Sequence, residues 1–397
     1  MTGGDVRRID APRVLVTGAA LADGRGPDLR RGVSMLVEGS RVAGIWDAAD
    51  VPDVGEVEHI DASGATLVPG MVDSHSHVTM QGGAQWIARG ADPTGTLLSV
   101  AEENGDLLVR AGVRWARDVG APRRDGKALS LRVRQSWAGR ANRPYLRVAG
   151  TWLIAPGALP SGLGVECADG DSLLAAVLGQ LDDGTDLVKL YLDGPDRTIA
   201  PFTVDEVRAV VEAVHARGAR VAAHASQTAG ARVGAGAGVD SIEHGFRLDA
   251  DICAAMAAGG TTLVTTLAVL YSWQTFIRTS TVDKFVADDF PERLGEILEA
   301  ANHSVQLART AGVAIAGGSD FGGGSLRANQ LAWEAQALVR AGLAPWEALA
   351  AVTWRGGELF GDPYAGRLEV GGPAHFALVH GDPLDDPDAL WRVWLVR

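Results

Sequence analysis

Two histidines separated by one residue, His75 and His77, close the apolar stretch 67–78, which reads LVPGMVDSHSHV. The run before them predicts a short buried strand that is entered through a turn at Pro69 and Gly70. Alternate residues of a strand lie on one face, so both imidazoles can point into one cavity and hold one metal ion. A His-x-His pair also fits a surface loop, so its meaning depends on the rest of the chain.

Further reactive side chains lie on other apolar segments that predict strands, and they are Lys189, His224, His244 and Asp320. Taken singly, each has a structural explanation, because a histidine can be hydrogen-bonded in a core and an aspartate can cap a glycine-rich turn. Taken together with the first pair, they form a set of nitrogen and oxygen ligands suited to Zn²⁺ or a similar divalent ion.

Lys189 is conspicuous because the chain contains only three lysines, while its other basic residues are arginine. It lies in the apolar segment DLVKLYLD, where burial would disfavour the charged ammonium. A neutral lysine amine can take up carbon dioxide and become a carbamate, a two-oxygen ligand able to bridge two metal ions, whereas arginine cannot. The alternative is a lysine whose alkyl stem is buried and whose ammonium reaches the surface.

Composition narrows the class of partner. The 397 residues are 47% hydrophobic and carry a net charge of −13, which disfavours nucleic acid and anionic membranes and leaves a small-molecule substrate. The first residues lack the apolar stretch of a signal peptide and no segment reaches the length of a membrane span, so we expect a cytoplasmic protein. Cys167 and Cys253 do not predict a disulfide framework. Whether the chain forms a homo-oligomer is left open.

Eight segments predict strands, each followed by a candidate helix, and they are 67–75, 112–120, 145–150, 187–192, 220–225, 241–246, 261–267 and 313–320. Residues 203–217 and 291–310 are two of the predicted helices, the first opened by a capping box. This alternation predicts an α/β fold with a (β/α)8 TIM barrel, whose active site would lie at the carboxyl ends of the strands. The β-rich ends predict a small β-sandwich, with domains at residues 1–66 and 363–397 flanking a barrel at 67–362.

These motifs resemble the amidohydrolase superfamily, in its branch of imidazolonepropionase and metal-dependent prolidases. The similar segments are PGMVDSHSHV, GVRWARDVG, GTDLVKLY, RVAAHA, GVDSIEHG, GGSD and the returning stretch GRLEVGGPAHFALVHGDPLDD. The resemblance implies that His75, His77 and Asp320 bind the more buried of two Zn²⁺ ions and His224 and His244 the more exposed one. Carboxylated Lys189 would bridge them, which favours two metals over the single metal of imidazolonepropionase-type members.

Such a site would activate water and polarise a carbonyl, with Asp320 as general base and then general acid. We expect hydrolysis of an amide bond in a small acylated amino acid, a peptide-like compound or a cyclic amide. Ester, lactone or carbamate hydrolysis, or deamination, decarboxylation or ring closure or opening, would use the same metals, and a non-catalytic scaffold is the remaining alternative. Expected substrate-binding residues are Tyr191, Trp152 and Tyr271, with Trp273 beside them.

Two features depart from the family. The loop after the third strand, GTWLIAPGALPSGLG, lacks the Gly-Gly-His sequence of prolidase-like members, so dipeptide specificity is in doubt. His375 stands in the returning segment where an aspartate is usual, and it lies far from the expected metal ligands in the sequence.

Overall fold

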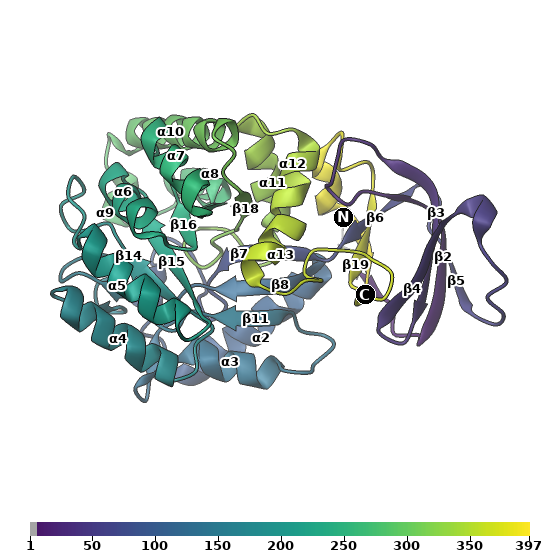
Figure 1. Cartoon of the computed structure of the whole chain (residues 1–397), viewed down its shortest axis with the longest axis horizontal. Coiled ribbons are helices and arrows are strands. Elements are labelled where there is room, and N and C mark those ends of the chain that lie inside the picture. The colour runs from purple at the N-terminus through teal and green to yellow at the C-terminus, as the bar shows by residue number, and fades with distance from the viewer. Residues whose placement is uncertain (1–5) are drawn as a thin grey trace.

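The computed structural model describes residues 6–397 of the chain, which form a larger helix-covered region and a smaller region that is mainly sheet. Figure 1 shows the smaller region on the right, where the earliest described strands lie beside the last ones. No helix within residues 6–397 is long and apolar enough to cross a membrane. Both cysteines, Cys167 and Cys253, are buried free thiols.

The smaller region is one eight-stranded sheet made from both ends of the chain. Its order is β1-β20-β19-β6-β2-β3-β4, with β5 beside β2. The strands are β1 (Arg7–Arg8), β2 (Arg13–Leu21), β3 (Arg30–Glu38), β4 (Arg41–Asp47), β5 (Glu58–Asp61), β6 (Ala65–Pro69), β19 (Phe376–His380) and β20 (Val393–Val396). Because β1 pairs with β20 and β6 with β19, the prediction that the two chain ends meet is confirmed.

The larger region contains two parallel sheets, in the orders β11-β8-β7 and β13-β12-β14-β15-β16-β17-β18. Their strands are β7 (Met71–Ser76), β8 (Val113–Asp118), β11 (Tyr145–Val148), β12 (Leu153–Ile154), β13 (Val165–Glu166), β14 (Leu187–Tyr191), β15 (Arg220–Ala225), β16 (Ser241–His244), β17 (Thr262–Thr265) and β18 (Ile315–Gly317). A short hairpin joins β9 (Arg123–Arg124) to β10 (Lys127–Ala128). All eight predicted segments therefore contain a strand.

The first of these segments is divided, contrary to prediction. Its start belongs to β6 in the terminal sheet and its end to β7 in the parallel sheet, and Gly70 separates them. A Cβ atom at Gly70 would lie 2.8 Å from Cγ of Arg114, so only glycine lets the chain pass this close to β8.

Within residues 6–397 the parallel strands form two hydrogen-bonded ladders and not one closed ladder of eight strands. Two gaps separate the sheets, one between β18 and β7 and one between β11 and β14. A single backbone hydrogen bond crosses near each gap: the amide of Asp320 donates to the carbonyl of His75 at 2.8 Å, and the amide of Asp186 donates to the carbonyl of Val148 at 3.0 Å. The chain passes closely at the first gap, since a Cβ at Gly318 would lie 2.4 Å from Cβ of His75. Short edge strands such as β18 leave too few residues for a longer ladder there.

Helices cover the outside of the parallel sheets (Figure 1). They are α1 (Trp86–Arg89), α2 (Thr94–Arg110), α3 (Leu129–Trp137), α4 (Gly170–Asp182), α5 (Val204–His215), α6 (Thr228–Ala237), α7 (Ala250–Gly259), α8 (Leu267–Trp273), α9 (Asp283–Val286), α10 (Phe290–Thr310), α11 (Leu331–Arg340), α12 (Pro345–Ala351) and α13 (Trp354–Phe360). The predicted helices 203–217 and 291–310 correspond to α5 and α10. Thr203 and Glu206 form the predicted capping box, which satisfies otherwise free amides at the start of α5.

Candidate metal centre

Six residues named from the sequence surround one cavity of about 810 Å³ at the carboxyl ends of the parallel strands. They are His75, His77, Tyr191, His224, His244 and Asp320. Parallel strands direct their carboxyl ends to one edge of a sheet, which is why residues from β7, β14, β15, β16 and the end of β18 converge.

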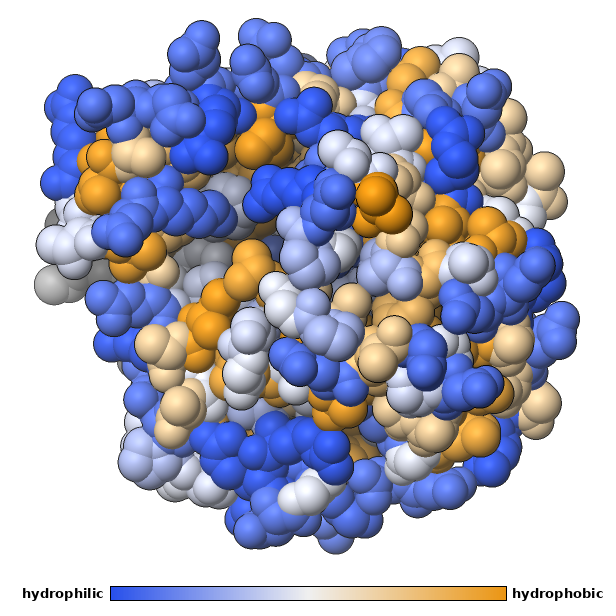
Figure 2. Space-filling view, turned by 90° about the vertical axis from the view of Figure 1, so that its left-hand side faces the viewer, coloured by the Kyte–Doolittle hydropathy of each residue, from blue (hydrophilic) through white to orange (hydrophobic). Residues whose placement is uncertain are grey.

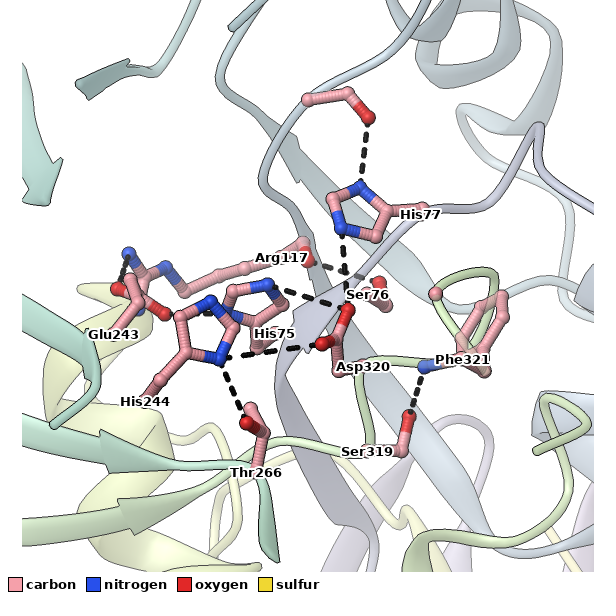
Figure 3. Close-up of polar contacts among 12 residues, drawn as sticks. His75, Ser76, His77, Arg117, Glu243, His244, Thr266, Ser319, Asp320 and Phe321 are labelled. Atoms are coloured by element: carbon pink, nitrogen blue, oxygen red, sulfur yellow. Dashed lines mark hydrogen bonds and ion pairs between the residues drawn. The ribbon is translucent and has the colours of Figure 1, made fainter. Parts of the chain in front are cut away.

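Asp320 lies at the centre of this group, and Figure 3 shows imidazoles directed toward its carboxylate from different strands. Its Oδ1 atom is 3.3 Å from Nε2 of His77 and 3.6 Å from Nε2 of His75, and its Oδ2 atom is 4.0 Å from Nδ1 of His244. Asp320 and His244 both have left-handed backbones, with φ of 52° and 73°. Non-glycine residues adopt this conformation at a cost that is found mainly at functional sites.

His75, His244 and Asp320 each offer a ligand atom, and these atoms lie within 4.8 Å of one another. A divalent ion placed roughly 2.0–2.2 Å from nitrogen and oxygen ligands needs them this close together. Burial, with the nearby Lys189, holds the pKa of His75 well below its usual range, and burial with His224 does the same to the pKa of His244. Both rings are therefore neutral, the form that binds a metal.

Hydrogen bonds hold the Nδ1 atoms of three of these imidazole rings. Nδ1 of His75 is 2.7 Å from Oε2 of Glu243, and Nδ1 of His77 donates to the carbonyl of Gly120 at 2.9 Å. Nδ1 of His244 is 2.8 Å from Oγ1 of Thr266. A His75 ring that donates from Nδ1 presents a free Nε2 to the centre, which is the usual arrangement of a histidine ligand held by a carboxylate.

Glu243 was not predicted from the sequence, although it has no exposed surface and stands beside His244. It also accepts hydrogen bonds from Ser241 and, at 3.4 Å, from Arg117 (Figure 3). Its only signal in the sequence is a carboxylate inside an apolar strand. A buried carboxylate is costly unless other groups satisfy it, and the three donors here do so.

Asp118 and Asp73 are two further buried carboxylates that hold the site in place. Asp118 accepts from the backbone of Val78 at 2.8 Å, next to His77, and burial raises the pKa of Asp118 to about 6. Asp73 accepts from the hydroxyl of Ser319 at 2.6 Å, next to Asp320. They therefore position the chain on either side of the ligands without reaching the cavity.

Lys189 has no exposed surface, and its Nζ atom has no hydrogen-bond partner within the described chain, although its charge acts on His75 and His244. Burial lowers the pKa of Lys189 to about 8, although Glu243 and Asp320 oppose that change. A buried amine without a hydrogen-bond partner is costly.

His224 lies on the other side of the cavity from the pair that ends β7. Its Nε2 atom is 3.2 Å from Oδ2 of Asp193, and its ring stacks on Tyr191 with 4.0 Å between centroids. The His224 and His244 rings are 4.5 Å apart, so both predicted ligands of the second metal are neighbours. Asp193 was not predicted, and it lines the cavity two residues after Tyr191.

The predicted substrate-binding residues differ in position. Tyr191 lines the cavity, but Trp152 has no exposed surface and packs behind His77, with 5.5 Å between ring centroids. Tyr271 is absent from the lining and lies under the guanidinium of Arg340. Trp273 does line the cavity.

The outer wall of the cavity is aromatic and carries two cations. Its aromatic residues include Trp86, Phe246, Trp273 and Phe285. Nζ of Lys284 lies 3.7 Å from the ring centroid of Trp273, and Arg197 lines the same wall. The charged groups that act on Lys284 are two other cations, Arg197 and Arg293, and no carboxylate of the described residues is among them. On the face of the larger region shown in Figure 2, hydrophobic side chains gather toward the middle, with hydrophilic ones around them.

Imidazole and carboxylate ligands at the carboxyl ends of parallel strands define this protein as a metal-dependent hydrolase. A model of the amidohydrolase family matches residues 66–394, so the chain belongs to that family, whose members act on C–N bonds. The resemblance based on its motifs is thereby confirmed.

An uncharacterised protein of Mycobacterium tuberculosis is 32% identical over 341 residues, covering 84% of each chain. Ochratoxinase of Aspergillus niger is 25% identical over 428 residues, covering 97% of this chain and 86% of its own. The crystal structure of a Xaa-Pro dipeptidase has a TM-score of 0.81 at 23% identity, covering 96% of this chain and 97% of that one, and shows a shared fold.

Proposed function

We propose that this chain is a binuclear hydrolase that cleaves the amide bond of a small acylated amino acid. The observation that carries the proposal is the buried amine of Lys189, which has no hydrogen-bond partner among the described residues and lies close enough to His75, His244 and Asp320 to act on them electrostatically. A carbamate on Lys189 would supply the anionic oxygens needed to bridge two ions, with His75, His77 and Asp320 on one side and His224 and His244 on the other. Zn²⁺ suits this ligand set.

A divalent ion held there would polarise the substrate carbonyl and make water more acidic. The protein's own contribution centres on Asp320, whose carboxylate faces the cavity and can accept the proton of the attacking water. The same carboxyl group can then return that proton to the leaving nitrogen. Glu243 keeps the His75 ring in its orientation throughout, because its hydrogen bond to Nδ1 lies away from the cavity.

The outer wall of the cavity supports a substrate with an apolar body and a carboxylate. Aromatic side chains suit the former, and the cations Lys284 and Arg197 suit the latter. Tyr191 would contact the scissile group, because it lies next to His224. The Xaa-Pro dipeptidase, whose fold this chain shares, is named for a dipeptide substrate, whose scissile bond is an amide.

We also infer that the two parallel sheets act as a (β/α)8 barrel. The domains predicted at residues 1–66, 67–362 and 363–397 remain our proposal, except that the first boundary moves to Gly70 because β6 ends at Pro69 in the terminal sheet. The close passage of Gly318 by His75 supports a barrel at that gap. A cytoplasmic location and small-molecule substrates fit the net charge of −13 and remain predictions.

Metal content and turnover of the native enzyme and of Lys189→Ala test this function. We expect about two metal equivalents and release of free amino acid from N-acyl amino acids in the native enzyme, and a marked loss of both in Lys189→Ala. Lys127→Ala is the matched control, because Lys127 pairs with Asp183 at the surface. Unchanged metal and turnover in Lys189→Ala would refute the bridging role, and ammonia as the sole product would indicate deamination.

A further inference from the structure

A second cavity, of about 780 Å³, lies between the terminal sheet and the larger region. Its walls include the turn after β3, the segment from α3 to β11, the residues before β19 and the last residue, Arg397. We call it the interdomain cleft. It shares none of its lining with the cavity that holds the metal ligands.

Arg114 of β8 lines the interdomain cleft and is only 3% exposed. Its Nη1 atom donates to the carbonyl of Ala141 at 3.1 Å, while its Nε atom has no partner. Among the described residues no carboxylate forms an ion pair with it, and the titratable groups that act on its pKa are Tyr145 and Arg8. A buried guanidinium stays charged, because even a pKa lowered by burial to about 10 exceeds neutral pH. A buried charge without a counter-ion is strongly unfavourable.

The other basic residues of the interdomain cleft fall into two groups. Most are already paired with carboxylates, and they are Arg8, Arg134, Arg140, Arg143 and Arg147. Arg41 and Arg397 instead donate to backbone carbonyls, those of Gly371 and of Ala11. The acidic lining residues are Asp10, paired with Arg8, and Asp362, which accepts from the amide of Tyr364. The interdomain cleft therefore keeps an excess of positive charge around Arg114.

His375, the nearby titratable side chain, does not balance the positive charge of Arg114. It lines the same cleft, and burial together with Arg114, Arg397 and Arg8 lowers the pKa of His375 to about 3, so its ring is neutral. Its Nδ1 atom has no partner. A carboxylate at position 375 would lie near Arg114, whereas the neutral imidazole leaves the charge of Arg114 uncompensated.

We propose that the interdomain cleft binds a small oxyanion, a phosphate or carboxylate group of a small molecule, on Arg114 with Arg397 and Arg41. The planar guanidinium of Arg114 is suited to such a group, and the site lies apart from the metal ligands. This binding is independent of the hydrolytic reaction and of its substrate.

Isothermal titration of the metal-loaded enzyme with inorganic phosphate and, separately, with malonate tests the proposal. Arg114→Met removes the buried cation, and His375→Asp supplies an internal carboxylate that should compete with the added anion. Arg147→Met is the matched control, because Arg147 lines the same cleft but pairs with Asp186. We expect at least one of the two anions to bind to the native enzyme and the control, and to bind about tenfold or more weakly to both test variants.

If Arg114→Met fails to fold, His375→Asp still decides the test. This variant adds a carboxylate beside the buried charge of Arg114 and removes no ion pair. Phosphate that binds at the metal centre instead would inhibit hydrolysis, and neither Arg114→Met nor His375→Asp would change that inhibition. Tighter binding of phosphate than malonate, or the reverse, would identify the chemical source of the oxyanion. Equal binding in all four proteins, or no binding of either anion to the native enzyme, would overturn the proposal.

Discussion

The two ends of β8 differ in how their buried charges are paired. At its carboxyl end, Asp118 helps to position His77, in a region where carboxylates and neutral imidazoles gather. At its amino end, Arg114 faces the interdomain cleft without a carboxylate. The first end has the composition of a cation site and the second that of an anion site. Burial alone therefore does not define the function of a charged group. The charges of the neighbouring groups, and whether one of them pairs with it, define that function.

Asp320→Asn gives the strongest test of the cation end. We expect turnover of an N-acyl amino acid to fall by about 10²–10⁴-fold, because the amide cannot accept and return the proton. Phosphate binding in the interdomain cleft should not change, as measured by calorimetry on the same preparation. Asp196→Asn, on an exposed loop, is the control for a generic loss of charge. A turnover within a few-fold of native would exclude Asp320 as the proton carrier.

Glu243→Gln tests whether the carboxylate hydrogen-bonded to His75 positions that ring for metal binding. The variant keeps the size of the side chain but weakens its hold on Nδ1, so we expect metal affinity to fall about 10–100-fold. Metal titration followed by activity measures this, and excess metal should restore much of the turnover. Glu299→Gln, at an exposed position on α10, is the control. If metal affinity does not move, the hydrogen bond has no positioning role.

Gly70→Ala should disturb the anion end while sparing the cation end. The added Cβ would meet the Arg114 side chain at 2.8 Å, so we expect about 1–3 kcal/mol of destabilisation and weaker phosphate binding. Chemical denaturation and calorimetry measure these effects. Gly26→Ala is the control, because a Cβ at Gly26 meets open space and its φ is ordinary. Gly64→Ala is less suitable, because Gly64 has a left-handed φ of 79°. A loss of turnover larger than the loss of phosphate binding would contradict the separation of the two ends.

Lys284→Gln should have the smallest effect, confined to substrate binding. An exposed cation contributes less than about 1 kcal/mol, so we expect KM for a carboxylate-bearing substrate to rise by no more than about fivefold, with kcat unchanged. The corresponding substrate with an amide in place of its carboxylate is the control, and its KM should not respond. Equal changes for both substrates would mean that Lys284 packs on Trp273 without recognising charge.

The strands and the positions of the candidate ligands along them were largely predictable, for a local reason. Strand alternation and the position of a residue at the end of an apolar run are readable in sequence, so His75, His224 and His244 could be placed on strands that structure confirms. Substrate contacts were less predictable. Trp152 follows the third strand as expected, but its ring turns behind His77 and away from the cavity. The direction of a side chain in a loop depends on packing against distant segments.

The amino-acid sequence by itself determined which side chains stand at the ends of the strands, because strand periodicity is a property of neighbouring residues. Only the tertiary structure decided which of them meet. The bond from Glu243 to His75 joins residues far apart in the chain, and the isolation of Arg114 depends on which carboxylates fail to reach it. Whether two charged or polar side chains pair depends on how closely the strands that carry them lie in the fold. The local sequence around each residue does not determine that distance.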